Sequence, residues 1–461
     1  MKNVTLLILL TILTFSFAAC NKDEDITFDP NAKLSFSTDS VLFDTVFTSV
    51  GSTVRRFKIF NYNDKAINLD EIKIGGGANS PFVINVNGRQ MAEGKNIKIN
   101  GNDSINVLVK VTIDPTLQTQ TFIVEDAILM SFNGKQEKIP LVAYGQNAIF
   151  LKNESIKSNS VWDSKLPYII SNLVTVEENA TLTIAAGTKI LFHNGSTMNV
   201  KGTLTAVGTK QDSILFASDR TERIYEEEPG QWNGIHFYAS SKNSVINHAT
   251  IKNGIAGITV DSLSSNSNPK LVLANTVVKN MQVVGLLGYH TNLVAYNNLF
   301  HNCGQYLVYG IGGGTYDLAQ NTFGAYNYSF ARRTSGVHLS DFISATEFAS
   351  LNATLTNNII WGSLEDELTI EKKSTAVSVV NLKNNLIKTT KTEFNGNDNI
   401  INIDPLFINP RQGNFKISDT SPAKNKGLNL SSHPYFTIYL SKDILEKQRL
   451  FPSELGCYEN N

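Results

Sequence analysis

The tetrapeptide Asn297-Asn298-Leu299-Phe300 recurs along the chain as Gln320-Asn321-Thr322-Phe323, Asn357-Asn358-Ile359-Ile360 and Asn384-Asn385-Leu386-Ile387. Weaker copies stand earlier, as His248-Ala249-Thr250-Ile251 and Asn275-Thr276-Val277-Val278. Counted at the final apolar residue, successive copies follow one another by 27, 22, 23, 37 and 27 residues. A period in the twenties with an occasional insert indicates a solenoid, whose coils bury their inward side chains against the coils above and below.

The second position of the four strong copies is always asparagine: Asn298, Asn321, Asn358 and Asn385. Asparagines in the same place on successive coils can stack as a ladder of amides. Amides also bind sugars, but the regular period favours amides that satisfy each other. We therefore interpret these four residues as structural.

Short apolar strands begin before the repeat and follow one another closely between residues 173 and 206. Gly187, Gly195, Gly202 and Gly208 separate them, at places where the chain must turn sharply or take a positive φ. Four-residue strands at this density leave no room for ordinary hairpin loops. They predict a right-handed parallel β-helix.

Residues 33–147 show a different pattern, in which alternating strands are separated by turn residues. Asn102-Asp103-Ser104 opens one such strand, which continues through Val107 and Val109 to Val111. Strands of this kind without helical periodicity predict an antiparallel β-sandwich. Residues 43–59 resemble the immunoglobulin-like modules that precede larger domains in bacterial surface proteins.

Several motifs resemble the pectate-lyase-like β-helix superfamily. Residues 182–219, with Ala186-Gly187-Thr188, look like its opening coils, and residues 229–235 are similar to a group of Bacteroidota lipoproteins that join an immunoglobulin-like module to such a helix. Residues 404–407, 421–423 and 455–459 resemble the closing cap of those proteins. The resemblance implies a fold but leaves the activity open, because the superfamily holds lyases, hydrolases, epimerases, adhesins and inert scaffolds.

The expected organisation is all-β. It comprises a signal peptide (1–20), a linker (21–32), an immunoglobulin-like β-sandwich (33–147), a right-handed parallel β-helix (148–422) and a C-terminal cap (423–461). We expect the cap to cover the exposed last edge of the helix, which would otherwise invite association.

The N-terminal residues have the features of a sorting signal. Lys2 precedes an apolar run too short for a comfortable membrane span, and Phe17-Ala18-Ala19-Cys20 closes it as a lipobox. An ordinary secretory signal with a chance cysteine is the alternative. Residues 21–25 resemble the export signal that sends Bacteroidota lipoproteins to the outer face of the outer membrane, although a plain solvated linker would also fit. We expect an outer-membrane lipoprotein acylated on Cys20, facing outward.

The composition narrows the possible partners. With 40 Lys and Arg against 41 Asp and Glu the net charge is −1, so nucleic-acid binding is disfavoured and membrane attachment rests on the lipid. Cys303 and Cys457 are the remaining cysteines; two buried thiols are favoured over a bridge. We expect a monomer.

Two clusters of residues could catalyse a reaction or bind a ligand, and the first is an acidic loop. Asp219, Arg220 and Glu226, together with the more distant His290, are the candidates for catalysis. The adjacent Asp-Asp of polygalacturonase-type hydrolases is missing, and three consecutive carboxylates cannot all converge on one ion. The histidines show no metal-ligand spacing. We therefore expect no cofactor and no metal, with calcium considered only if the protein were a lyase.

The second cluster combines aromatic and cationic side chains that could contact a sugar; its candidate residues are Tyr289, His290, Tyr306, Arg332, Arg333 and His338. Aromatic rings stack on pyranose faces and guanidinium groups pair with carboxylates, which favours an acidic polysaccharide. The alternatives are that the rings fill corners of the coils and that the two arginines solubilise a loop.

These observations favour a non-catalytic surface protein that binds or displays a polysaccharide. A polysaccharide lyase or glycoside hydrolase of the β-helix superfamily is the alternative, and if the chain is an enzyme we expect a lyase. An adhesin or structural spacer is the third possibility.

Overall fold

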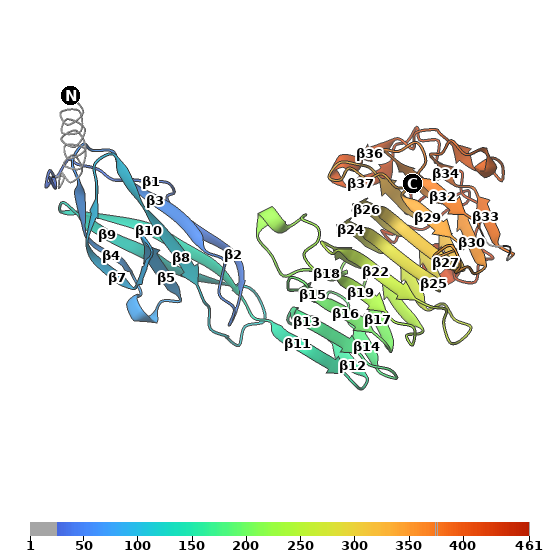
Figure 1. Ribbon diagram of the computed structural model, residues 1–461, viewed down its shortest axis with the longest axis horizontal. Helices are drawn as coiled ribbons and strands as arrows, with labels where there is room; N and C mark the ends of the chain where they lie inside the picture. The colour runs from blue at the N-terminus through green and yellow to red at the C-terminus, as the bar shows by residue number, and fades with distance from the viewer. Residues whose placement is uncertain (1–24, 374, 376, 461) are drawn as a thin grey trace, which may run out of the picture. The chain divides into compact units, whose positions relative to one another are not determined.

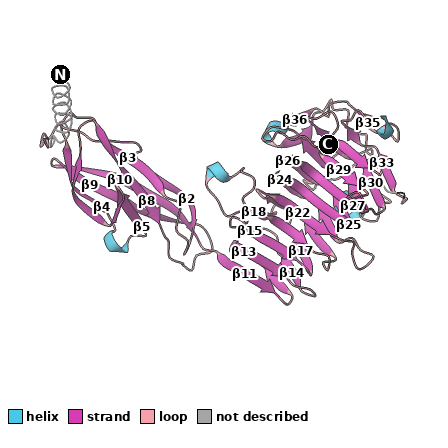
Figure 2. Cartoon of the chain, viewed as in Figure 1, coloured by secondary structure: helices cyan, strands magenta, loops and turns pink. Residues whose placement is uncertain are grey.

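The structure is a computed structural model that describes residues 25–373, 375 and 377–460. The chain divides into two compact units, with the boundary between Asn147 and Ala148 (Figures 1 and 2). The predicted signal peptide, Cys20 and residues 21–24 lie outside the described residues. No helix in the described part of the chain is long and apolar enough to cross a membrane.

The first unit is a sandwich of two five-stranded sheets. One sheet has the order β1 (Ser35–Phe36), β3 (Arg55–Asn61), β8 (Asp103–Val111), β5 (Phe82–Val86) and β6 (Arg89–Met91). The other has the order β2 (Val41–Phe47), β10 (Lys135–Gln146), β9 (Phe122–Phe132), β4 (Ile67–Ile74) and β7 (Glu93–Ile99). The strand pairs are antiparallel except β2 with β10, which run parallel.

Buried and exposed residues alternate along the strands, and this pattern explains why the two sheets pack face to face. In β8, Ile105, Val107, Val109 and Val111 are buried, while the residues between them face outward. Period-2 burial is what a sheet with one covered face requires.

The second unit is a β-helix built from one 25-stranded parallel sheet. Its first strands are β11 (Ile149–Ile156), β12 (Ser160–Trp162), β13 (Tyr168–Val176), β14 (Thr181–Ile184), β15 (Lys189–Phe192), β16 (Thr197–Val200), β17 (Thr203–Val207) and β18 (Ile214–Ser218). The middle strands are β19 (Gly234–Phe237), β20 (Ser244–Asn247), β21 (Ala249–Lys252), β22 (Ala256–Asp261), β23 (Leu271–Ala274), β24 (Val277–Met281), β25 (Val284–Tyr296) and β26 (Leu299–Cys303). The last are β27 (Tyr306–Ala319), β28 (Thr322–Ala325), β29 (Val337–Ser340), β30 (Leu351–Thr356), β31 (Ile359–Gly362), β32 (Leu368–Glu371), β33 (Val379–Lys383), β34 (Leu386–Ile387) and β35 (Ile400–Ile401).

Each coil contributes strands to three faces, so that most strands pair with the strand three further along the chain. The strands β25 and β27 are longer and cover two faces each. The all-β class, with a sandwich followed by a parallel β-helix, is therefore confirmed.

The final apolar residue of the repeated tetrapeptide forms one column of the core. Successive members pair in register and are fully buried: Ile251, Val278, Phe300, Phe323, Ile360 and Ile387. The column places equivalent side chains directly above one another, which is why the sequence repeats with the length of a coil.

The repeated asparagines form a continuous ladder beside this column. Asn298 Nδ2 donates to Asn321 Oδ1 at 3.0 Å, and Asn321 Nδ2 donates to Asn358 Oδ1 at 3.0 Å. Asn358 Nδ2 then donates to Asn385 Oδ1 at 2.9 Å. All four side chains are buried, and each also donates to a backbone carbonyl, for example Asn358 to Leu318 at 2.8 Å.

The C-terminal segment, residues 404–460, packs along the side of the coils. It contains β36 (Phe407–Asn409), β37 (Asn414–Ile417), and the short helices η4 (Pro410–Gln412) and η5 (Phe436–Leu440). Asn384 Nδ2 donates to the Lys426 carbonyl at 3.0 Å, and Asn297 Nδ2 donates to the Lys442 carbonyl at 2.8 Å. We expected residues 423–461 to cover the last edge of the helix; the contacts of Lys426, Leu428 and Lys442 instead lie at the corners of successive coils.

Candidate functional site

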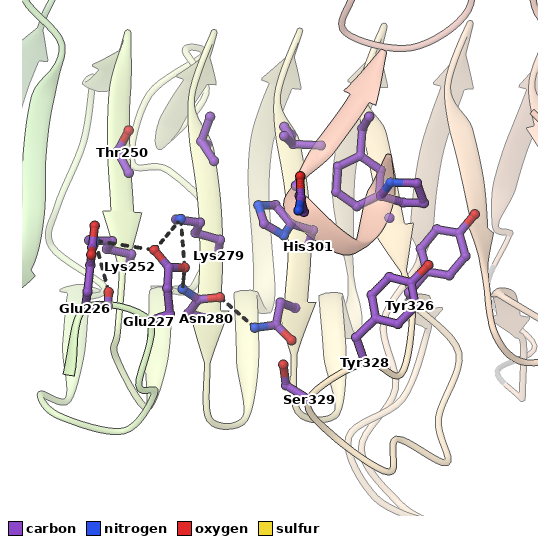
Figure 3. Close-up of a pocket in the computed structure, with 18 of the residues that line it drawn as sticks. Glu226, Glu227, Thr250, Lys252, Lys279, Asn280, His301, Tyr326, Tyr328 and Ser329 are labelled. Carbon is purple, nitrogen blue, oxygen red and sulfur yellow. Dashed lines mark hydrogen bonds and ion pairs between the residues drawn. The ribbon is translucent and has the colours of Figure 1, made fainter. Parts of the chain in front are cut away.

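A groove of about 860 Å³ lies on the outer face of the β-helix (Figure 3). Its floor is a row of outward side chains on β21, β24 and β26: Lys252 pairs with Lys279, and Lys279 with His301. His301 pairs in turn with Gly324 of β28, where the lack of a side chain lets the Phe415 ring pack against the strand backbone. Each of these residues comes directly after a core residue, so alternation along the strand turns it outward.

One wall is the loop between β18 and β19, which brings Glu226 and Glu227 to the groove. Asn253 holds this loop, because its Nδ2 donates to the carbonyls of Glu226 at 3.1 Å and Glu228 at 2.8 Å. Lys252 Nζ donates to the same Glu226 carbonyl at 3.0 Å. The acidic loop is therefore fixed on the coils by its backbone.

Glu227 is the centre of the charged network in Figure 3. Lys279 Nζ donates to its two oxygens at 3.0 and 2.9 Å, Asn280 donates to one of them, and Lys252 Nζ lies 3.8 Å away. Burial alone would raise the pKa of Glu227, but the hydrogen bonds from Lys279 and Asn280 outweigh it and lower this pKa. Glu227 is thus a poor proton donor at neutral pH.

Two further groups at the floor are shifted toward their neutral forms. Burial lowers the pKa of Lys252, against the opposing charge of Glu227. Burial, followed by the charge of Lys279, lowers the pKa of His301 to about 3. The imidazole of His301 is therefore neutral throughout the physiological range and can both donate and accept a hydrogen bond.

The second wall comes from the C-terminal segment. Phe415 of β37 lies against His301, with their ring centroids 5.2 Å apart, and Arg411 of η4 also lines the groove. Tyr326 and Tyr328 stack at 5.1 Å with an interplanar angle of 2°, and the Arg411 guanidinium lies 5.6 Å from the Tyr328 ring centroid. Tyr328 is 45% exposed, so one end of the groove offers an accessible aromatic ring beside a cation.

A second, shorter asparagine row ends in the groove. Asn302 Nδ2 donates to Asn280 Oδ1 at 2.6 Å, and Asn280 donates in turn to Glu227. The Asn302 Oδ1 has no hydrogen-bond partner among the described residues.

The four residues considered for catalysis do not converge. Only Glu226 lines the groove. Asp219 Oδ2 bonds to His193 Nδ1 at 2.8 Å, and Arg220 pairs with Glu222 at 3.0 Å. His290 Nδ1 bonds to the Gly312 carbonyl at 2.8 Å on another part of the coils. In the described part of the chain, no group of three or more His, Cys, Asp or Glu side chains is placed to hold a metal ion.

The predicted aromatic cluster lies on a different face from the groove. Tyr306 and Tyr309 of β27 stack at 4.2 Å, and His338 of β29 meets the Tyr309 ring edge-on at 5.2 Å. Tyr289, at 38% exposed, belongs to the neighbouring strand β25, and Arg333 is exposed in the loop before β29.

Arg332 is a correction to the sequence-based assignment. Its side chain is 1% exposed, its Nη2 pairs with Glu367 at 2.8 Å, and its guanidinium also donates to the carbonyls of Ala325 and Thr334. A guanidinium buried in this way fastens the loop and cannot reach a ligand.

Sequence reasoning missed Lys252 and Lys279. A signal was present, because each one directly follows the final apolar residue of a repeat copy, at Ile251 and Val278. Arg411 and Phe415 carried no such signal, since the segment that holds them does not repeat.

No protein-family model and no curated protein matches the chain. Among solved structures, the catalytic unit of the thermostable GH87 alpha-1,3-glucanase from Streptomyces thermodiastaticus strain HF3-3 aligns at a TM-score of 0.32 and 10% identity, over 72% of this chain and 74% of that one. The E. coli chaperone DraB aligns at 0.19 and 10% identity, over 26% of this chain and 57% of its own. A family 123 glycoside hydrolase from Clostridium perfringens aligns at 0.19 and 9% identity, over 28% and 31%. Likenesses this distant carry no functional argument.

Proposed function

We propose that this chain is a non-catalytic polysaccharide-binding protein, held at the outer face of the outer membrane by a lipid on Cys20. The observation that supports it best is the groove. There the exposed Tyr328 ring, the Arg411 guanidinium and the neutral His301 line one continuous depression. Aromatic faces with a few convergent polar groups are what sugar sites use.

The charges favour an acidic polysaccharide over a neutral one. Among the described residues that line the groove, two acidic side chains stand against four cationic ones: Glu226 and Glu227 against Lys189, Lys252, Lys279 and Arg411. A guanidinium can pair with a uronate carboxylate through two parallel hydrogen bonds.

The carboxylates in the groove argue against glycoside hydrolysis. A hydrolase needs one protonated carboxyl group to serve as the acid and a second one as nucleophile or base. Glu227 is kept ionised by Lys279 and Asn280, which leaves Glu226 as the one other carboxyl group among the described residues that line the groove. Burial raises the pKa of Asp219, but this residue is engaged with His193 outside the groove. The groove is thus better suited to holding a glycan than to cleaving it.

A polysaccharide lyase is the second candidate, and Lys252 is the observation that favours it. Burial lowers the pKa of this amine, and a lysine of lowered pKa is a suitable base for removing a proton next to a uronate carboxylate. Appearance of unsaturated uronate products, abolished by Lys252→Gln, would establish this activity.

Affinity electrophoresis through gels containing an acidic or a neutral polysaccharide tests the proposal. We expect the acidic polysaccharide to retard the wild type, and Tyr328→Ala/Arg411→Ala to lose most of that retardation. Tyr306→Ala/Arg333→Ala, on the other aromatic face, is the matched control and should behave as the wild type. A loss in the control alone would move the site to that face, and a wild type that no polysaccharide retards would overturn the proposal.

A further inference from the structure

The groove has an open end and a closed end, and the burial of its floor shows which is which. Beside the row of Lys252, a second outer row of side chains crosses β15, β18, β21, β24 and β26 in register: Lys189, Leu215, Thr250, Val277 and Leu299. Lys189 is exposed, the next three side chains are half-buried, and Leu299 is buried. The outer row therefore passes from solvent into the protein as it approaches β26.

The C-terminal segment closes this face of the β-helix from β26 onward. Phe415 shares a buried cluster with Leu299. Thr322 follows Leu299 in the outer row, and its Oγ1 accepts a hydrogen bond from the Cys457 backbone N–H at 3.0 Å. Ile359 comes next in the row and is buried as well. A linear polymer that lies along the outer row therefore cannot continue beyond Leu299.

The two long sides of the groove are also walled. The acidic loop is bound to the corner after β21, and Tyr328 continues that side toward the closed end (Figure 3). On the other side the C-terminal segment reaches the corner before β21, where Glu446 Oε1 lies 3.8 Å from His248 Nε2. The walls formed by the described residues thus leave the end at Lys189 as the entrance for a linear chain.

The cations that could hold a ligand lie at the two ends of the groove. In the middle, Lys279 and Lys252 face Glu227, so their charge is partly offset. At the closed end Arg411 is exposed beside the Tyr328 ring, and Lys189 is exposed at the entrance. A carboxylate paired with Arg411 would place its sugar ring beside Tyr328, an arrangement that suits a single terminal acidic residue.

We propose that the groove binds the end of an acidic polysaccharide chain and does not bind the interior of the chain. This inference rests on the proposed function and specifies the part of the polymer that is held. The terminal residue lies between Tyr328 and Arg411, and the chain leaves the groove over Lys189. From β26 to β15 the path covers four inter-strand steps of about 4.8 Å, or about 19 Å, which is long enough for a short oligosaccharide.

Calorimetric titration with fragments of defined length, cut from the uronate polymers polygalacturonate and alginate, tests the proposal. We expect the number of protein molecules bound per chain to stay constant when the fragments are made longer than the groove, because each chain keeps one end of the required kind. The capacity per unit mass of polymer should fall in inverse proportion to chain length. A groove that held chain interiors would find more sites on each longer chain.

Two substitutions test the direction of the bound chain. Arg411→Gln should weaken binding of fragments of every length, because the terminal residue always contacts the closed end. Lys189→Gln should leave the shortest fragments unaffected and weaken the longer ones by about two- to fivefold, the loss expected for an exposed ion pair. Lys416→Gln, at an exposed position of β37 that does not line the groove, is the matched control and should bind all fragments as the wild type does.

The outcomes separate this inference from the proposed function. If the protein bound per chain increases in proportion to chain length, binding to chain ends is overturned and the proposed function stands. An equal loss in Lys189→Gln for the shortest and the longest fragments would overturn the direction of the chain. If neither polymer binds at any length, the proposed function is overturned, and chain-end binding with it.

Discussion

Replacing Asn358 with leucine, a side chain of similar shape, tests how much the amide ladder contributes to stability. The Asn358 Nδ2 donates to the Leu318 carbonyl at 2.8 Å and to Asn385 Oδ1 at 2.9 Å. Its Oδ1 accepts from the backbone and side-chain nitrogens of Asn321 at 2.9 and 3.0 Å. Leucine removes all four bonds and leaves their partners buried. At about 1 kcal/mol each, the loss should be roughly 3–5 kcal/mol.

Urea unfolding followed by tryptophan fluorescence suits this measurement. Trp162, Trp232 and Trp361 are the only tryptophans, and all lie in the β-helix, so the sandwich does not contribute to the signal. Asn352→Leu, at an exposed position of β30 in the same coil, is the control and should change the free energy of unfolding by about 0.5 kcal/mol or less. Equal effects of the two substitutions would refute the reasoning that the ladder amides depend on each other.

Three further predictions concern the loop ion pair, the acidic loop and the anchor. Arg332→Met should destabilise the β-helix by about 3–5 kcal/mol, because it leaves Glu367 as a buried charge without its partner; unfolding in urea measures this, and adding Glu367→Gln should recover part of the loss. The pKa of Glu227 is lowered from the ordinary value of 4.5. Its ion pair with Lys279 therefore holds the acidic loop above pH 4.5 and is lost as the pH falls through the lowered pKa. Limited proteolysis across this range should cleave the loop sooner at acid pH than at neutral pH, and Asp419→Asn, a substitution outside the loop, should show the same pH dependence. A cleavage rate independent of pH would contradict the assignment. Cys20→Ala should release the protein from membranes in cell fractionation, whereas a variant that stays membrane-bound would exclude the lipid anchor.

The fold could be predicted because its determinants repeat. Each coil must bury one residue at the position of Ile251 and its successors, so the demand for an apolar side chain recurs with the length of the coil. The same logic locates the ladder, since an amide at Asn321 needs an amide on the next coil, at Asn358, to bond with.

The site was harder to predict because its residues face outward, where packing does not require the same kind of side chain on every coil. Arg332 and Arg333 look alike in sequence, yet one is buried against Glu367 and the other is exposed. Neighbouring residues of an irregular loop can point in opposite directions, and the partner that decides between them lies 35 residues away. An adjacent pair of arginines therefore could not be assigned to a ligand from sequence alone.

The first asparagine of the repeated pair shows why the C-terminal segment escaped prediction. Asn297, Asn357 and Asn384 all take a positive φ, between 52° and 59°, a conformation that asparagine tolerates better than most residues. This backbone turn directs the first amide outward, where Asn357 Nδ2 donates to the Leu428 carbonyl at 2.9 Å, while the second amide joins the ladder. The turn explains the first asparagine on backbone grounds alone, so nothing in the repeat reveals that its side chain also binds a distant segment. One pair of residues thus closes each coil, links it to the next and attaches the wall of the groove.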